Sequence, residues 1–324
     1  MDNIRKIQNY INDELQKALM SEEEYSCVLT NPVNYMLQTK GKRIRPLLTI
    51  LSYQLFQEDL RQIINQAISL EIFHNFTLTH DDITDSANIR RGKPTINKTC
   101  GNDIAMLVGD AILIHSFKFL HNIRSEHFKD VTDAFYKMSM QLCEGQILDI
   151  NYGTREDISE KEYIEMVTKK TATMLAYSLK IGAILGDAKI ADQELLYNLG
   201  INLGIAFQLE DDLLDIYASK ELWGKQIGSD IINKKKTFPF VKALILTSEA
   251  DRLSLLTYFH ECHAIEDIEK IKEIYSKSNI IESCQDSINY YYSQANACLK
   301  SISVDESQKV DLYSIISMLK HRVY

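Results

Sequence analysis

The stretch EIFHNFTLTHDDITD, residues 71–85, ends in the acidic cluster Asp81-Asp82-Ile83-Thr84-Asp85. The same Asp-Asp-x-x-Asp spacing returns 130 positions later as Asp211-Asp212-Leu213-Leu214-Asp215. Both clusters lie in strongly helical stretches, and residues four apart on a helix sit nearly above one another, offset by about 40°. The first and last aspartates of each cluster therefore project from one helix face. Two carboxylates one turn apart repel by roughly a few tenths of a kcal/mol, and a bound Mg²⁺ ion, which also takes phosphate oxygens and water, relieves that repulsion.

One such cluster on a helix is usually an exposed acidic face that binds nothing. Two copies with identical spacing, each flanked by apolar helix and followed by basic residues, favour a metal site instead. We therefore predict that six carboxylates take part in magnesium binding: Asp81, Asp82, Asp85, Asp211, Asp212 and Asp215.

The composition predicts an all-α protein. The chain has 324 residues, a length that by itself suggests about two domains. It contains only 12 Gly and 4 Pro, far below the usual 7% and 5% or so, and no Ser/Pro/Gly-rich linker divides it. Apolar residues make up 45% of the chain, enough for a large core. We expect one domain over residues 1–324, a single helical bundle of more than four helices.

The hydrophobic periodicity locates the helices. Ile4, Ile7, Ile11, Leu15 and Leu19 recur at helical spacing, a turn is expected at Asn31-Pro32, and a short helix should follow it. Further helices are expected at about 46–56, 60–85, 102–122, 127–152, 159–186, 190–218, 239–248, 250–259, 266–276, 279–299 and 305–320. No convincing strand pattern appears. Basic loops at 86–100 and 221–237 follow the acidic clusters, so we expect a cavity with carboxylates on opposite walls, cationic loops at its mouth and an apolar interior.

Charge and cysteine usage exclude several classes. The net charge of −9 argues against a nucleic-acid-binding surface. The six cysteines are scattered without a CxxC motif, as in proteins of a reduced compartment. We interpret His260-Glu261-Cys262-His263 as a helix end and not as a metal site. Without a visible signal peptide or a run of 18 apolar residues, we expect a cytoplasmic protein with no membrane span.

Several ordered motifs together resemble one family. They are Gly41-Lys42-Arg43-Ile44-Arg45-Pro46, residues 71–85, Arg90-Arg91-Gly92-Lys93-Pro94-Thr95, Gly109-Asp110, residues 141–149, Lys169-Lys170-Thr171, residues 204–212, Gly224-Lys225, Gly228-Ser229-Asp230 and Thr237-Phe238-Pro239. Over almost its whole length the chain resembles the trans-isoprenyl diphosphate synthases, or polyprenyl synthetases. The resemblance implies the all-α isoprenoid synthase type I fold around a central cavity, usually in a homodimer. It also implies a prenyltransferase that joins isopentenyl diphosphate head-to-tail to an allylic diphosphate and releases pyrophosphate.

The resemblance also assigns roles to residues. Breaking the allylic C–O bond gives a carbocation and pyrophosphate, whose charge metals and fixed cations stabilise best. By resemblance, Asp81, Asp85 and Asp211 anchor Mg²⁺, three ions per site, with Asp82 and Asp215 in support. The other implied groups are Arg90, Lys170, Lys225 and Lys235 on the allylic diphosphate, Lys42, Arg45, His74 and Arg91 on isopentenyl diphosphate, and Lys170, Thr171 and Gln208 in catalysis. Thr171 and Gln208 would direct oxygen dipoles at the carbocation. Lys235 lies within a run of three lysines, which leaves its register open.

Product length in this family depends on bulk just before the first acidic motif. Phe76 lies five residues before Asp81, with Thr77 beside it and Phe73 as a further candidate plug. An aromatic residue there, with the acidic motif unexpanded, resembles enzymes that make geranylgeranyl diphosphate. We rank a C20 product first, C15 second and longer chains third.

Two other functions compete with prenyl transfer. A class I terpene cyclase shares the fold and the first motif, but usually carries a different second metal motif and lacks the isopentenyl diphosphate pocket. A non-catalytic subunit of a partner synthase tends to lose the aspartates, which this chain retains.

Overall fold

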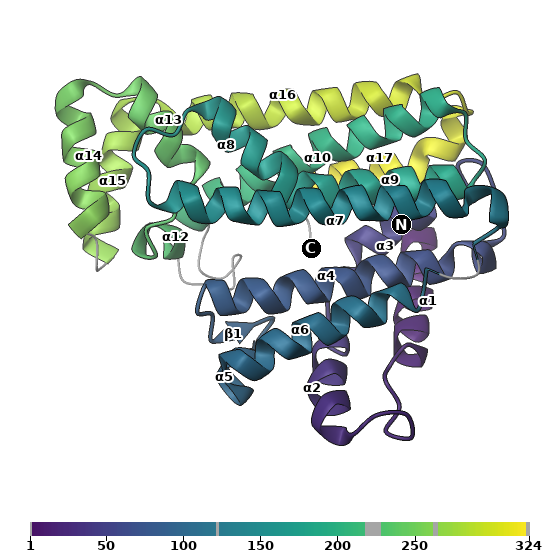
Figure 1. Ribbon diagram of the computed structural model, residues 1–324. Helices are drawn as coiled ribbons and strands as arrows, with labels where there is room; N and C mark the ends of the chain where they lie inside the picture. The colour runs from purple at the N-terminus through teal and green to yellow at the C-terminus, as the bar shows by residue number, and fades with distance from the viewer. Residues whose placement is uncertain (1, 121–122, 218–227, 262–264, 322–324) are drawn as a thin grey trace. The chain divides into compact units, whose positions relative to one another are not determined.

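The computed structural model describes residues 2–120, 123–217, 228–261 and 265–321 (Figure 1). The described chain is almost entirely helical, which confirms the all-α prediction. The helices up to the middle of the chain are α1 (Asp2–Lys17), α2 (Cys27–Leu37), α3 (Ile44–Gln54), α4 (Ile64–Thr84), α5 (Ile96–Cys100), α6 (Asn102–Phe117) and α7 (Ser125–Gly153). The later helices are α8 (Glu160–Val167), α9 (Thr173–Leu185), α10 (Ile190–Tyr217), α12 (Ser229–Ile232), α13 (Phe238–Leu246), α14 (Glu249–Glu261), α15 (Ile265–Lys277), α16 (Ile280–Ser301) and α17 (Val310–His321).

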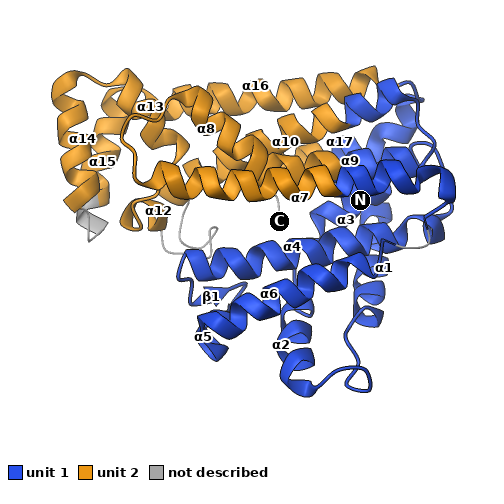
Figure 2. Ribbon diagram, in the orientation of Figure 1, with its two compact units in different colours: residues 1–135, 178–196, 303–314 blue, residues 136–177, 197–302, 315–324 orange. Residues whose placement is uncertain are grey.

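The helices group into two compact units (Figure 2). Unit 1 comprises residues 1–135, 178–196 and 303–314, and unit 2 comprises residues 136–177, 197–302 and 315–324. The division falls inside α7, α9, α10 and α17 and, between residues 302 and 303, just after α16. The single domain expected over residues 1–324 stays a prediction.

Unit 1 is organised around α4, which contacts α1, α2, α3, α5 and α6. The sequence explains this central position, because α4 is apolar on most sides and its residues 66–75 are all buried. The polar side chains in that stretch need partners inside the protein. Ser69 finds one by donating to the main-chain oxygen of Ser116 on α6, at 2.9 Å.

Unit 2 contains a π-helical turn at Thr168–Ala172 between α8 and α9. The helix expected over 159–186 is present from Glu160 to Leu185, with this π-helical turn inside it. Residue 145 on α7 lies against this turn, and a Cβ at Gly145 would come within 2.3 Å of the main-chain nitrogen of Lys170. Only glycine permits this approach, which brings Lys170 directly beside α7.

Two local predictions were wrong. Asn31-Pro32 is not a turn, since Pro32 lies inside α2. The ring removes one helical hydrogen bond, to the carbonyl of Val28, but Val28 is 78% exposed, so water can replace the lost partner. The region 86–100 is not wholly loop either, because β1 (Ile89–Arg90) and β2 (Lys93–Pro94) form an antiparallel pair before α5.

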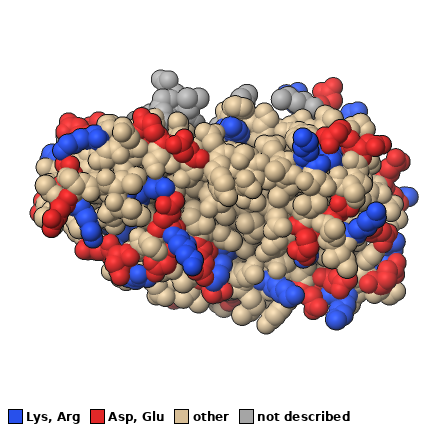
Figure 3. All heavy atoms as spheres, turned by 90° about the horizontal axis from the view of Figure 1, so that it is seen from above, with Lys and Arg blue, Asp and Glu red and all other residues tan. Residues whose placement is uncertain are grey.

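Three further expectations concern the end of helix α14, the charges on the surface and membrane-spanning helices. Helix α14 is described as far as Glu261, within the His260–His263 segment; residues 262 and 263 lie outside the described chain, so the helix end there stays a prediction. On the face shown in Figure 3, lysine and arginine side chains are interspersed with aspartate and glutamate, unlike a basic nucleic-acid footprint. Within the described ranges, no helix has the length and apolarity needed to span a bilayer.

Candidate active site

The first acidic motif occupies the last turn of α4 in unit 1. Asp85 is the C-cap residue, and its N–H donates to the main-chain oxygen of Asp81 at 2.8 Å. Asp81 is half-buried, Asp85 is exposed, and both belong to the same helical turn. Their carboxylates are therefore the pair that helical spacing places on one face.

Asp82, between them, has a different environment. It is 3% exposed, and both Nε and Nη2 of Arg90 on β1 lie 2.7 Å from its Oδ1. Burial raises the pKa of Asp82 above its ordinary value, while Arg90 acts in the opposite direction. Arg90, which the resemblance assigns to the allylic diphosphate, thus also anchors the hairpin to the end of α4.

The hairpin turn brings Arg91 to the Lys42 segment. Arg91 and Gly92 both have left-handed backbone angles, with φ of 52° and 75°. A Cβ on Gly41 would lie 2.7 Å from Nη1 of Arg91, so the absence of a side chain at residue 41 makes room for this guanidinium. Two of the four residues expected at the isopentenyl diphosphate pocket, Arg91 and the Gly41 neighbour Lys42, therefore lie on adjoining segments.

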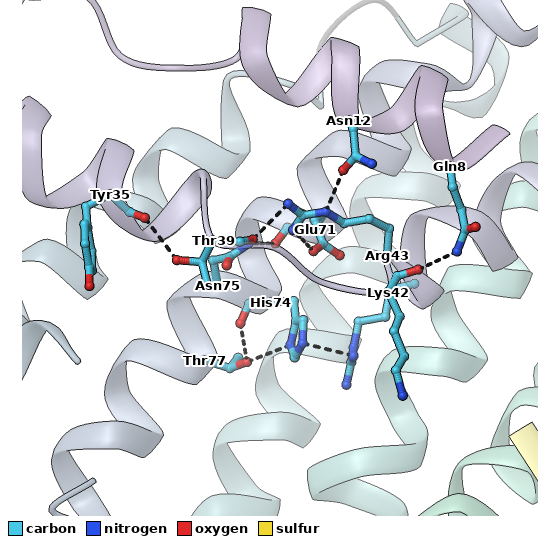
Figure 4. A network of polar contacts seen from close by, with 11 residues as sticks. Gln8, Asn12, Tyr35, Thr39, Lys42, Arg43, Glu71, His74, Asn75 and Thr77 are labelled. Atoms are coloured by element: carbon cyan, nitrogen blue, oxygen red, sulfur yellow. Dashed lines mark hydrogen bonds and ion pairs between the residues drawn. The ribbon is translucent and has the colours of Figure 1, made fainter. Parts of the chain in front are cut away.

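His74, drawn with Thr77 in Figure 4, forms a second part of the same cluster together with Arg45. Nη1 of Arg45 lies 3.1 Å from Nε2 of His74. A guanidinium can only donate, so Nε2 accepts and the ring proton resides on Nδ1, 3.4 Å from the hydroxyl of Thr77. Burial, and then Arg45 and other nearby arginines, hold the pKa of His74 well below its ordinary value. His74 is therefore a neutral acceptor that orients Arg45.

Arg43 was not predicted as a functional residue. It has a left-handed φ of 54° and is 6% exposed. Its Nη1 lies 2.6 Å from Oε1 of Glu71, which is itself buried, in the network drawn in Figure 4. A signal was available in the sequence, because a glutamate in the middle of a buried helix requires a cationic partner.

The second acidic motif lies near the end of α10 in unit 2. Asp212 is 3% exposed and accepts three hydrogen bonds, from the hydroxyl of Tyr163, from Nε2 of Gln208 at 3.0 Å and from the N–H of Phe238 at 3.0 Å. Burial raises the pKa of Asp212 to about 6, and the three hydrogen bonds oppose that shift. Asp212 consequently connects α10 to α8 and α13.

The same network orients two of the predicted catalytic residues. A carboxylate only accepts, so the amide nitrogen of Gln208 must face Asp212. Oε1 of Gln208 then accepts from the hydroxyl of Thr171, 3.0 Å away. The hydroxyl hydrogen of Thr171 is used in this bond, so its oxygen presents only lone pairs to any further neighbour.

Asp215 is 2% exposed and holds the next segment. Its Oδ1 accepts from the hydroxyl of Ser229 at 2.7 Å, and its Oδ2 accepts from the N–H of Asp230 at 3.0 Å. These bonds tie the end of α10 to the start of α12. In the second motif, Asp211 is half-buried whereas Asp212 and Asp215 are buried among protein donors.

The structure describes contacts for some of the predicted lysines of unit 2 and does not describe others. Nζ of Lys170 lies 2.5 Å from Oδ2 of Asp149 on α7. Lys234 and Lys236 donate to the main-chain oxygens of Phe259 and Arg155, at 2.6 and 2.8 Å. The assignment of Lys235 as the lysine of the motif stays a prediction. Lys225 lies outside the described residues.

The residues expected to limit chain length form part of an aromatic cluster in unit 1. The ring of Phe76 meets those of Phe73 and His80 edge-on, with centroids 5.3 and 4.8 Å apart. Phe73 packs in turn against Phe135, and Thr77 donates to the main-chain oxygen of His74. Phe76 is therefore braced by neighbours that limit its movement.

The carboxylates fit a hard cation. Among the side chains that the structure describes, no three His, Cys, Asp or Glu residues converge to hold a metal by themselves. Mg²⁺ does not require this, since it binds proteins through one or two carboxylates and fills its remaining positions with water and phosphate. The Asp81 and Asp85 pair offers such a donor set.

Comparison with known proteins identifies the family of the chain. The family model described as polyprenyl synthetase matches residues 26–278. The chain is 37% identical over 248 residues to a geranylgeranyl diphosphate synthase of Methanosarcina mazei, covering 75% of each chain. It superposes on a crystal structure of a geranylgeranyl pyrophosphate synthase with a TM-score of 0.92 and 33% identity, over 99% of both chains. The Corynebacterium glutamicum enzyme of the same name, complexed with isoprenyl diphosphate and magnesium, gives a TM-score of 0.89 at 25% identity, over 98% of this chain and 99% of that one. The protein is therefore a member of the polyprenyl synthetase family.

Proposed function

We propose that this protein is an Mg²⁺-dependent prenyltransferase that condenses isopentenyl diphosphate with an allylic diphosphate and makes a C20 trans-prenyl diphosphate. Prenyl transfer itself follows from the family and from relatives that share this activity. The substrates' positions, the ions and the product length are the proposed parts. A C15 product is the second choice, and longer chains are the third.

One observation supports two diphosphate sites over one. Helix α4 carries the aspartate pair at its end and His74 seven residues earlier, about 10 Å along the helix axis. The first position offers carboxylates, which hold a diphosphate only through metal. The second offers Lys42, Arg45 and Arg91, which bind a diphosphate directly. A terpene cyclase acts on a single diphosphate and has no need of the second position.

The residues then divide the reaction between them. Mg²⁺ on Asp81, Asp85 and Asp211, three ions in all, would neutralise charge on the departing pyrophosphate. Arg90, Lys170, Lys225 and Lys235 would hold the same group, with Asp82, Asp212 and Asp215 fixing the surrounding segments. Lys170 would leave Asp149 to contact it.

The cationic cluster would keep the second substrate ordered. Neutral His74 accepts from Arg45 and so aims the remaining donors of that guanidinium away from the ring. Thr171 presents only oxygen lone pairs, which stabilise positive charge developing on the allylic carbon. The released pyrophosphate is the proposed acceptor of the final proton.

A homodimer and a cytoplasmic location complete the proposal. Helix α6 exposes several large apolar side chains, which a second copy of the chain could cover; they are Ile104, Met106, Leu107, Ile114 and Phe117. The five cysteines that the structure describes are free, as expected in a reducing compartment. Light scattering after gel filtration measures the assembly, and a monomer would contradict it.

The test is an incubation of the purified protein with Mg²⁺, labelled isopentenyl diphosphate and a set of allylic primers. Chain extension that stops on addition of EDTA supports the proposal. A cyclic hydrocarbon formed without isopentenyl diphosphate would identify a cyclase, and no product with any primer would indicate a non-catalytic subunit.

Product length has its own test. Phe76→Ala removes the braced ring before Asp81 and should lengthen the products made from farnesyl and isopentenyl diphosphates, with Phe128→Ala, an exposed ring on α7, as control. Chromatography of the dephosphorylated products reports the change. An unchanged product ladder would exclude Phe76 from length control.

A further inference from the structure

Helix α1 lies outside the region that matches the family model, which begins at residue 26. The helix is nevertheless docked on unit 1, since Ile4, Ile7, Ile11 and Leu15 are buried and it contacts α3 and α4. Two polar residues beside this apolar stripe, Gln8 and Asn12, are one turn apart. Both reach the segment that carries Lys42 and Arg45.

The contacts are specific. Nε2 of Gln8 donates to the main-chain oxygen of Lys42 at 2.9 Å, and Oδ1 of Asn12 accepts from Nε of Arg43 at 3.1 Å (Figure 4). One bond therefore fixes the backbone just before Arg43, and the other fixes the Arg43 side chain.

Arg43 is the centre of this arrangement. Its three nitrogens contact three different elements: Glu71 on α4 at 2.6 Å, the main-chain oxygen of Thr39 after α2 at 3.0 Å, and Asn12 on α1. A non-glycine residue with positive φ costs roughly 1 kcal/mol. The three partners maintain this conformation, in which Arg43 is buried while its neighbour Lys42 is exposed.

The arrangement also sets the register of the segment against α4. Glu71 and His74 are three residues apart, so they lie on the same face of α4. Arg43 contacts the first and Arg45 contacts the second. Glu71 additionally cancels the charge of Arg43, which would otherwise repel the neighbouring cations at short range.

We propose that α1 is a positioning element for isopentenyl diphosphate: through Gln8, Asn12 and the Arg43–Glu71 pair it holds Lys42 and Arg45 where they can bind the second diphosphate. The proposal rests on the function proposed above. It adds that residues which never touch substrate determine the affinity for one substrate and leave the other unaffected.

The test compares three chains: wild type, Gln8→Ala/Asn12→Ala, and Asn9→Ala/Asp13→Ala on the exposed face of the same helix. The dissociation constant of isopentenyl diphosphate is measured by titration calorimetry in EDTA, because this site uses no metal. Loss of both hydrogen bonds loosens the segment that carries Lys42 and Arg45 and should weaken binding about tenfold in the first variant and less than twofold in the second. In steady-state assays the KM for isopentenyl diphosphate should rise similarly, with kcat and the KM for the allylic substrate within twofold of wild type.

Two conservative variants separate positioning from folding. Asn12→Asp keeps the acceptor for Arg43 and should retain wild-type affinity. Arg43→Lys keeps the charge but cannot contact three elements at once, so it should weaken the binding of isopentenyl diphosphate more than Gln8→Ala/Asn12→Ala does. Unchanged affinity in Gln8→Ala/Asn12→Ala, or an equal rise of both KM values with a lower Tm, would overturn the proposal.

The variant Lys42→Ala separates a failure of this inference from a failure of the proposed function on which it rests. If Lys42→Ala weakens the binding of isopentenyl diphosphate and Gln8→Ala/Asn12→Ala does not, only the positioning role of α1 is wrong. If Lys42→Ala also leaves the dissociation constant unchanged, the assignment of this pocket to isopentenyl diphosphate is wrong.

Discussion

The two acidic motifs share one spacing and differ in what surrounds it. In the first motif the second aspartate, Asp82, is buried against a guanidinium. In the second motif its counterpart, Asp212, is buried among a phenol, an amide and a main-chain N–H. The last aspartates differ more: Asp85 is exposed at the end of α4, whereas Asp215 is 2% exposed and caps α12.

Helical spacing therefore fixes the direction of a carboxylate but not its task. The task depends on which donors the neighbouring segments bring to it. In our proposal Asp81 and Asp85 of the first motif, one turn apart, and Asp211 of the second motif are the metal ligands. The remaining aspartates connect segments of their own unit.

The largest difference should appear in catalysis. Asp81→Ala and Asp211→Ala each remove a proposed metal ligand, and kcat/KM should fall by about 10³-fold. Steady-state assays over a range of Mg²⁺ concentrations measure the effect, with the exposed Asp133→Ala on α7 as control. Activity within tenfold of wild type in either variant would remove that aspartate from the metal site.

For the free energy of unfolding, in contrast to catalysis, the buried Asp212 should matter more than the exposed Asp85. Asp212→Ala leaves Tyr163 and the N–H of Phe238 buried without an acceptor, so unfolding should become easier by about 3 kcal/mol. Asp85→Ala, at an exposed position, should change the free energy of unfolding by less than about 0.5 kcal/mol. Urea denaturation of both variants tests this, and equal losses would mean that burial does not separate the two motifs.

The dependence of protein stability on pH should reveal the buried, neutral state of His74. Its folded pKa lies well below the unfolded value of about 6.5. The unfolded chain therefore binds the proton first, so the His74 contribution is complete above pH 6.5 and is lost as the pH falls toward the folded pKa, by at most about 1.4 kcal/mol per pH unit. Urea denaturation between pH 5 and 8 should show a weaker pH dependence in His74→Gln. Parallel curves for the two proteins would contradict the neutral, buried state of His74.

The smallest effect on catalysis should come from loosening the hydrogen-bond network that orients Gln208. Tyr163→Phe removes one of the three donors to Asp212 and loosens the network that orients Gln208 and Thr171. We expect kcat to fall about fivefold, which corresponds to roughly 1 kcal/mol, with the KM for isopentenyl diphosphate unchanged. Tyr290→Phe, at an exposed position on α16, is the matched control and should behave as wild type. An equal loss in both variants would exclude a role for Tyr163.

Much of this could be predicted from the sequence because it depends on local spacing. Few Gly and Pro residues and a 3.6-residue periodicity specify long helices, and the aspartate spacing specifies which carboxylates share a face. The all-α fold and the positions of most helices followed from those rules. The family motifs added the cationic cluster that includes Lys42 and Arg45.

The remainder depends on contacts between distant segments. A buried Glu71 indicates the need for a cation, but not that Arg43, 28 positions away, supplies it. Likewise, nothing near Asp212 indicates Tyr163, 49 positions before it. A proline in the sequence favours a turn, and the exposure of Val28 that permits Pro32 inside α2 is a tertiary property. The π-helical turn likewise has no periodic signature.

That turn has a consequence for how this enzyme can evolve. Deleting a single position within 168–172 would restore an uninterrupted α-helix, with better backbone bonding than the wide turn allows. The deletion would also swing everything on one side of it by about 100° relative to the other, separating Lys170 and Thr171 from Asp149 and Gln208. A one-residue deletion that regularises the backbone would therefore dismantle the contacts that hold the predicted catalytic residues together.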